Sequence, residues 1–115
     1  MELTHINEQG RAKMVDVSAK EETVRVAVAY GSIYMKKETL ERIKEGSIVK
    51  GDVLSVAQVG GIMGAKKTSD IIPMCHPIII SGCDINFSLN FEENKVEITA
   101  TAKTTGQTGI EMEAL

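Results

Sequence analysis

Two neighbouring stretches in the second half of the chain alternate apolar and polar side chains with a period of two residues. The apolar positions are Ile85, Phe87, Leu89 and Phe91 in the first stretch and Val96, Ile98, Ala100 and Ala102 in the second. Residues 92–94 form a short polar break between the two stretches. Because successive side chains of a strand point to opposite faces of a sheet, the pattern predicts an antiparallel hairpin with one buried face.

Two further segments predict extended structure. Within residues 23–35, Val24, Val26, Val28 and Tyr30 recur at every second position, which indicates a strand, and we expect a bulge in it at Gly31. Residues 78–91 form a long extended stretch that leads into the hairpin. The hairpin and the first strand together indicate an antiparallel sheet.

Helices are predicted between the strands. Residues 37–45 are helix formers followed by Gly46 at the stop position, and Asp52 is a suitable N-cap for a longer helix that runs to about Ser69. Strands mixed with helices favour an α+β fold, a ferredoxin-like antiparallel sheet with helices packed on one face.

The last residues, 110–115, resemble the first turn and a half of another helix. A helix this short is not stable by itself in water. We therefore expect residues 1–115 to form a single domain that is incomplete at its C-terminal side.

The predicted helix that begins after Asp52 contains three glycines, Gly60, Gly61 and Gly64. Each glycine costs a helix roughly 1 kcal/mol relative to alanine, so the favoured explanation is close packing of another chain segment against this helix. A phosphate-binding loop is the alternative. The P-loop pattern fails here, because only three residues separate Gly60 from Gly64 and Ala65 stands before the lysines.

Composition excludes several classes of protein. The 115 residues suffice for one domain, with 25% charged residues, 43% hydrophobic residues and a net charge of -3. Four aromatic residues and the lack of a basic stripe argue against nucleic-acid binding. No apolar run approaches the roughly 18 residues of a membrane span, and the first residues do not resemble a secretory signal, so we expect a cytoplasmic protein with two free thiols, Cys75 and Cys83.

The two prolines of the chain, Pro73 and Pro77, enclose Met74, Cys75 and His76. Proline restricts the backbone, so this loop is stiff and is either a structural connector or a binding site. A Cys75–His76 nucleophile pair is disfavoured, because adjacent side chains in an extended segment point to opposite sides. Metal binding is disfavoured as well, since the Cys and His residues lack the usual ligand spacing.

Lysines and carboxylates supply further candidates. Most lysines are expected on the surface, but Lys50 lies between an apolar pair and the N-terminus of the helix after Asp52. Partial desolvation near the positive end of a helix would lower its pKa toward the range useful for proton transfer. Glu111 and Glu113 are expected to face different directions at the start of the last helix, where carboxylates usually complement the helix dipole.

Several segments together resemble the cyclic pyranopterin monophosphate synthase family, the molybdenum cofactor biosynthesis protein C family. The matching stretches are residues 3–7, 14–20, 50–53, 65–68, 72–77 and 105–115. The most specific are Pro-x-Cys-His-Pro at 73–77 and Thr-Gly-x-Thr-Gly-x-Glu-Met-Glu-Ala-Leu at 105–115. The resemblance implies a ferredoxin-like lyase that converts a cyclised dihydroguanosine triphosphate into cyclic pyranopterin monophosphate and releases diphosphate.

The resemblance also implies which residues act. It places Lys50 and His76 in the catalytic set, Met74, Cys75, His76, Met112 and Glu113 at the substrate, and Glu111 beside them as a further candidate. No metal or organic cofactor is expected, and neither nucleic acid nor a membrane is an expected partner. Family members are homohexamers whose sites are shared between the subunits of a dimer.

Three functional classes stay open at this point. The first is the synthase; the second is a catalytically weak binding or assembly remnant of the same family, because members continue beyond the segment that matches residues 111–115 and carry a catalytic aspartate and a further lysine there. The third is a metal-binding or redox protein that uses Cys75 and Cys83. Diphosphate release from the cyclised substrate separates the first two classes.

Overall fold

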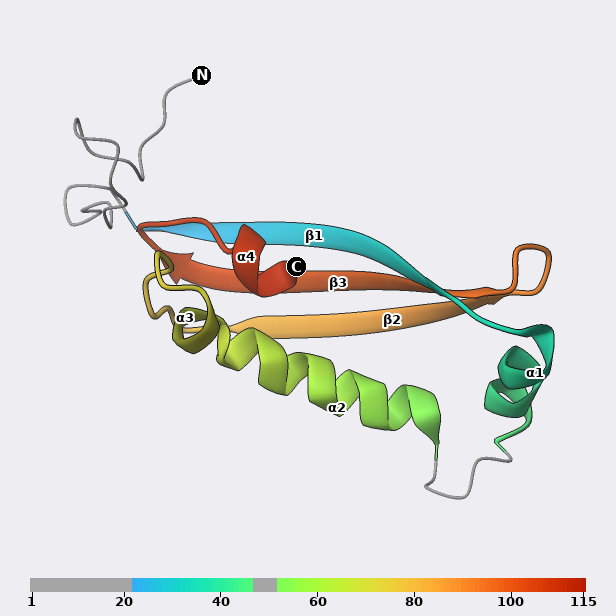
Figure 1. Cartoon of the computed structure of the whole chain (residues 1–115). Coiled ribbons are helices and arrows are strands. Elements are labelled where there is room, and N and C mark those ends of the chain that lie inside the picture. The colour runs from blue at the N-terminus through green and yellow to red at the C-terminus, as the bar shows by residue number, and fades with distance from the viewer. Residues whose placement is uncertain (1–21, 47–51) are drawn as a thin grey trace, which may run out of the picture.

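The computed structural model of the chain describes residues 22–46 and 52–115. Its elements are β1 (Thr23–Tyr34), α1 (Lys37–Glu45), α2 (Val53–Lys66), α3 (Thr68–Ile71), β2 (Gly82–Asn90), β3 (Lys95–Gly106) and α4 (Glu111–Ala114). The strands form one antiparallel sheet in the order β1-β3-β2 (Figure 1). The predicted α+β class, an antiparallel sheet with helices packed against it, is confirmed.

The strand register assigns one face of the sheet to the helices. Ala102 of β3 lies between Ala27 of β1 and Cys83 of β2, and Ala100 lies between Ala29 and Ile85 in the same way. These short side chains make the middle of the sheet flat, so a helix can approach it closely. The other face of β1 is apolar and exposed.

No bulge interrupts β1. Gly31 pairs with Ile98 in a register that runs without a break from Thr23 to Tyr34, so the predicted bulge is wrong. A glycine can occupy a regular strand position without a bulge when the neighbouring strand pairs with it residue for residue. The unbroken register keeps Val24, Val26, Val28 and Tyr30 on one face of the sheet and Ala27 and Ala29 on the other.

The helix boundaries follow local signals. α1 ends at Gly46, which adopts the left-handed conformation with φ of 68°, and Asp52 caps α2 by accepting a hydrogen bond from the backbone N–H of Leu54 at 3.0 Å. α2 ends at Lys66, before the predicted end near Ser69, and the separate turn α3 follows. None of the helices in the described ranges has the length and apolar character that a membrane crossing needs.

α2 packs along β2 with one of its three glycines against the sheet. A Cβ on Gly61 would collide with the Ile85 side chain, whereas Gly60 and Gly64 face open space. The Gln58 side-chain amide also donates a hydrogen bond to the Ile85 carbonyl oxygen at 3.4 Å. Close packing of this helix therefore explains Gly61, and the predicted explanation does not extend to the other two glycines.

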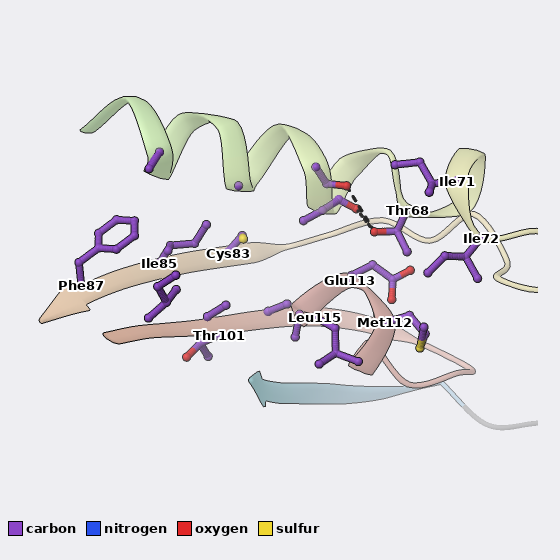
Figure 2. A pocket seen from close by; sticks show the side chains of 18 residues that line it. Thr68, Ile71, Ile72, Cys83, Ile85, Phe87, Thr101, Met112, Glu113 and Leu115 are labelled. Atoms are coloured by element: carbon purple, nitrogen blue, oxygen red, sulfur yellow. Dashed lines mark hydrogen bonds between the residues drawn. The ribbon is translucent and has the colours of Figure 1, made fainter. Parts of the chain in front are cut away.

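A cavity of about 450 Å³ lies between α2, the sheet and α4 (Figure 2). Its walls are mainly apolar and include Ala57, Ile72, Ile85, Phe87, Ile98, Ala100 and Leu115. Thr68 is one of its polar residues, and its hydroxyl donates a hydrogen bond to the Ala65 carbonyl oxygen at 2.9 Å. The cavity shows that α2 and α4 cover the same face of the sheet without meeting over its whole width.

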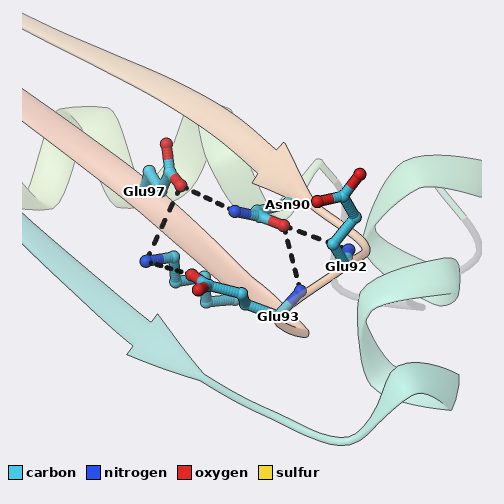
Figure 3. Close-up of polar contacts among 5 residues, drawn as sticks. Asn90, Glu92, Glu93 and Glu97 are labelled. Atoms are coloured by element: carbon cyan, nitrogen blue, oxygen red, sulfur yellow. Dashed lines mark hydrogen bonds and ion pairs between the residues drawn. The ribbon is translucent and has the colours of Figure 1, made fainter.

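Polar side chains organise the turn between β2 and β3 (Figure 3). The Asn90 side-chain oxygen accepts hydrogen bonds from the backbone N–H groups of Glu92 and Glu93, each at 3.0 Å. The Asn90 amide donates to Glu97 at 2.9 Å, and the Lys95 amine lies 2.7 Å from the Glu93 carboxylate. An asparagine that bonds backbone N–H groups in this way stabilises a turn, so the hairpin predicted from the alternating pattern is reinforced at its tip.

The core of the described structure joins the last helix to the sheet. Ala102, Ile110 and Ala114 form a buried cluster, and the partly buried Ala27, Ala29, Ile78 and Ile80 pack against it. Ile110, the residue before α4, is 1% exposed. Burial of this side chain stabilises the attachment of α4 and of the 78–80 segment at the same time.

Two isoleucines offer a matched test of this core. Replacing Ile110 by alanine is expected to lower the free energy of unfolding by about 2–5 kcal/mol, because the change leaves a cavity among packed side chains. Ile79→Ala makes the same chemical change at a side chain that is 84% exposed, and it should alter the free energy of unfolding by less than about 0.5 kcal/mol. Urea denaturation measures both, and equal losses in the two variants would contradict the assignment of the core.

Candidate functional site

One wall of the candidate site is the loop that follows α3. The Cys75 backbone N–H donates a hydrogen bond to the Ile72 carbonyl oxygen at 3.1 Å, which closes a turn across Pro73 and Met74. After Cys75 the chain continues without helix or strand to the start of β2 at Gly82. Proline at 73 and 77 restricts the backbone on both sides of Met74–His76, so the three side chains leave the loop in defined directions.

The extended part of this loop is attached to the core of the sheet. Ile78 and Ile80 pack against the buried cluster around Ala102. The Ser81 backbone N–H donates a hydrogen bond to the Lys103 carbonyl oxygen of β3 at 2.8 Å. The loop is therefore attached to β3, and the second wall begins at the C-terminal end of the same strand.

The second wall begins where β3 ends. Residues 107–110 turn the chain back over the sheet and lead into α4, which presents Glu111, Met112 and Glu113. The Glu111 carboxylate lies over Gly109 in the space that a Cβ on this residue would occupy. A side chain at 109 would displace the Glu111 carboxylate, so glycine at this position lets that carboxylate keep its place over the turn.

The two walls enclose a cavity of about 150 Å³. Its lining consists of Met74, Cys75, His76, Ile78, Thr108, Gly109, Glu111, Met112 and Glu113. Six of these were candidate residues from the sequence, and the fold brings all six together from segments more than thirty positions apart. The cavity is smaller than the roughly 300–1,000 Å³ of a typical small-molecule site, but polar groups converge on it as they do in such sites.

Sequence reasoning missed three of the lining residues, Ile78, Thr108 and Gly109. Thr108 and Gly109 belong to the Thr-Gly-x-Thr-Gly motif. This motif was used to recognise the family, but its own residues were given no role in the site. The motif itself was a signal, because glycine is the usual residue where the backbone turns tightly or approaches another group closely. Ile78 gave no such signal, since it follows Pro77 as an ordinary apolar residue.

The two carboxylates of α4 both reach the cavity. Glu111 and Glu113 were expected to face different directions, but each lines this cavity. Both carboxylates belong to the one turn of α4, and the loop 74–78 lies close enough for each of them to line the same cavity. Glu113 is half-buried and Glu111 is exposed, so the two groups differ in their contact with solvent.

Burial and negative charge keep the Cys75 thiol protonated. Desolvation raises its pKa above 9.0, and the nearby Glu113 carboxylate raises it further. A thiol becomes a good nucleophile only as the thiolate. No hydrogen bond joins Cys75 to His76 among the described residues, so the geometry gives no support to a Cys-His nucleophile pair.

The second cysteine lies elsewhere. Cys83, on β2, lines the larger cavity between α2 and the sheet, and both cysteines are free thiols. Burial raises the pKa of Cys83, Asp84 raises it further, and Lys66 opposes the change. Within residues 22–46 and 52–115, no group of three His, Cys, Asp or Glu side chains is placed to hold a metal ion.

Lys50, the predicted proton-transfer residue, lies outside the described residues. Asp52, two positions after Lys50, caps α2 and holds the start of that helix. The role of Lys50 in proton transfer therefore stays a prediction from the sequence. The metal and redox alternative built on Cys75 and Cys83 is not supported by their placement in different cavities.

A family model described as the MoaC family matches residues 14–115. The chain belongs to the MoaC family. Its relative from Thermoanaerobacter sp. (strain X514), named cyclic pyranopterin monophosphate synthase, is 72% identical over 115 residues, which are 100% of this chain and 73% of the relative.

Two more relatives carry the same name. The protein from Clostridium acetobutylicum is 70% identical over 112 residues, or 97% of this chain and 70% of the relative. The protein from Desulfitobacterium hafniense is 61% identical over 115 residues, or 100% of this chain and 70% of the relative. The family resemblance inferred from the motifs at 73–77 and 105–115 is confirmed.

The reactivity of Cys75 tests the electrostatics of the cavity. In a Cys83→Ser background, alkylation by iodoacetamide across a pH series should give a Cys75 pKa above that of a free thiol, with slow reaction at pH 8. Glu113→Gln removes the negative charge and should lower this pKa, but not to the ordinary value, because burial is the larger cause.

The control for this measurement is Glu111→Gln, which alters a carboxylate on the same helix. Glu113 is the carboxylate whose charge raises the pKa of Cys75, so the Glu111 variant should leave that pKa nearly unchanged. Alkylation of Cys75 at the rate of an unstructured thiol would contradict the described cavity.

Proposed function

We propose that this chain acts in molybdenum cofactor biosynthesis as a lyase, converting a cyclised dihydroguanosine triphosphate to cyclic pyranopterin monophosphate with release of diphosphate. The carrying observation is the convergence of Met74–His76 with Glu111–Glu113 around one cavity. Relatives up to 72% identical bear the name of this synthase, which supports the assignment.

The side chains of the cavity suit the base end of such a substrate. Carboxylates accept hydrogen bonds from ring and exocyclic N–H groups, which a guanine-derived ring carries on one edge. Met74 and Met112 offer flexible apolar contacts for the faces of the ring. We therefore propose that Glu111 and Glu113 recognise the N–H edge while the methionines contact the ring.

Charge decides which end of the substrate enters. Glu113 already raises the pKa of the Cys75 thiol, so the field in the cavity is unfavourable to negative charge. A triphosphate next to two carboxylates would be repelled. The phosphates must then lie away from α4, and Lys50 and His76 are the groups that would bind them through their N–H donors.

Proton transfer is the chemical task that remains for the protein. Opening a purine-derived ring and closing a pterin ring move several protons, and an imidazole such as that of His76 has one nitrogen that can accept a proton and one that can donate it. We propose His76 and Lys50 as the groups that exchange these protons. Attack of a ribose hydroxyl on the first phosphate needs alignment of the two groups, with diphosphate leaving.

We also propose that the chain assembles as a homo-oligomer, a homohexamer as the resemblance implies. The exposed face of β1 supports association, because Val24, Val26, Val28 and Tyr30 form an apolar row there and are between 48% and 79% exposed. Contiguous exposed apolar surface is typical of interfaces. The cytoplasm is the proposed location, where free thiols such as Cys75 and Cys83 remain reduced.

The alternative function is a binding or assembly role with weak turnover. The chain spans 70–73% of the length of the relatives above. In that case the 115-residue form binds the nucleotide or assembles with other subunits and turns over substrate weakly. Binding and turnover can be measured separately. A result with tight binding and no diphosphate would select this alternative.

The decisive experiment incubates the 115-residue protein with the cyclised dihydroguanosine triphosphate and follows diphosphate. The proposed synthase releases diphosphate at an enzyme-like rate, with a stoichiometric pterin product identified by fluorescence after oxidation. Calorimetric titration with the same compound reports binding. Absence of both binding and release would overturn the proposal.

Two variants assign the roles. Glu113→Gln should raise KM by roughly tenfold or more, since a hydrogen bond to a charged group contributes about 1.5–3 kcal/mol. His76→Gln should lower kcat while a bound substrate still forms, because it removes a proton-exchanging group. Glu92→Gln, an exposed carboxylate at the β2–β3 turn, is the matched control and should leave both constants unchanged. Equal effects of Glu92→Gln and Glu113→Gln would contradict the assigned site.

A further inference from the structure

Thr104 of β3 is a buried polar residue on the helix-covered face of the sheet. Its side chain is 2% exposed, and it lies two positions beyond Ala102 on the same face. A valine would fit this position in a strand equally well, because both side chains are β-branched and nearly equal in size. The hydroxyl therefore needs an explanation outside the sheet.

The explanation lies in the loop that forms the first wall of the small cavity. The Thr104 hydroxyl donates a hydrogen bond of 2.5 Å to the carbonyl oxygen of Ile79. Ile79 belongs to residues 76–81, which run beside β3 before β2 begins, and its own side chain is 84% exposed. Packing of the Ile79 side chain thus contributes little, and its backbone carbonyl is the attached group.

This hydrogen bond is close to the site on both sides. Ile79 follows His76 by three residues, a span of at most about 10 Å even when the chain is fully extended. Pro77 lies within that span and restricts it. On the other side, Thr104 lies five positions before Gly109 and seven before Glu111 in the sequence. The Thr104 side chain therefore adds a polar link between the Met74–His76 wall and the strand that carries the Glu111–Glu113 wall, besides the Ser81–Lys103 backbone hydrogen bond and the packing of Ile78 and Ile80.

We propose that Thr104 is a positioning residue that holds His76 at a set depth in the cavity through its hydrogen bond to the Ile79 carbonyl oxygen. The inference rests on the proposed function for its kinetic consequence, but the position of His76 can be measured without turnover. The hydroxyl acts on the substrate only through the loop.

The test compares Thr104→Val, which removes the hydroxyl at nearly constant volume, with Thr104→Ser, which keeps it. The valine variant should lower kcat/KM about tenfold, because the Ile79 carbonyl oxygen loses its partner and the loop shifts. The serine variant should stay within about twofold of the parent. If the valine variant does not fold, Thr104→Ala removes the same hydroxyl with less bulk and replaces it in the comparison.

A matched control separates positioning from loss of stability. Val96→Ala truncates a side chain of β3 that is 4% exposed and lies eight residues, or about 26 Å, from Thr104. It should destabilise the fold without changing kcat/KM at temperatures well below unfolding. The same temperature range is used for every variant.

The second readout is the ring-proton NMR signal of His76, assigned by its loss in His76→Gln. This signal should move in Thr104→Val and keep its position in Thr104→Ser and Val96→Ala. A valine variant that matches Val96→Ala in both readouts would overturn the inference, as would a serine variant that behaves like the valine variant. An inactive parent whose His76 signal still shifts in Thr104→Val would count against the proposed function and in favour of the positioning role.

Discussion

The contact between Ile110 and Ala102 is the packing interaction on which the candidate site depends. Ile110 is fully buried against the alanine-lined middle of the sheet, and the 78–80 segment packs on the same cluster. Larger side chains at the central strand positions would hold α4 away from the sheet. Because one small cluster attaches both walls of the cavity, the spacing of Cys75 and Glu113 is a property of the core.

Local signals in the sequence predicted the elements well, because each depended on few residues. The stop at Gly46, the cap at Asp52 and the alternation along β2 and β3 all appear in the structure. The bulge at Gly31 was wrong, since strand pairing with β3 decides the register and a single strand does not reveal its partner. Extended residues 78–81 likewise gave no sign that only the part from Gly82 joins the sheet.

The candidate site was predicted in part by composition of its motifs and in part only by resemblance. Proline spacing singled out Met74–His76 on physical grounds, whereas Glu111 and Glu113 looked like ordinary helix-start carboxylates. Their proximity to Cys75 depends on contacts between segments far apart in the sequence, so no local pattern could predict it. The same holds for Thr104, whose partner Ile79 is 25 positions away. Lys50 remains a prediction from the sequence, because it lies outside the described residues.

β1 is an edge strand of twelve residues whose outer backbone groups have no strand partner within the described part of the chain. Arg25 is its single charged residue, and it contains no proline. Segments of this composition recruit further strands from other molecules unless something covers them. Any subunit contact that covers β1 would therefore also protect the chain against amyloid-like growth, and handling at high concentration without such a contact would favour insoluble material.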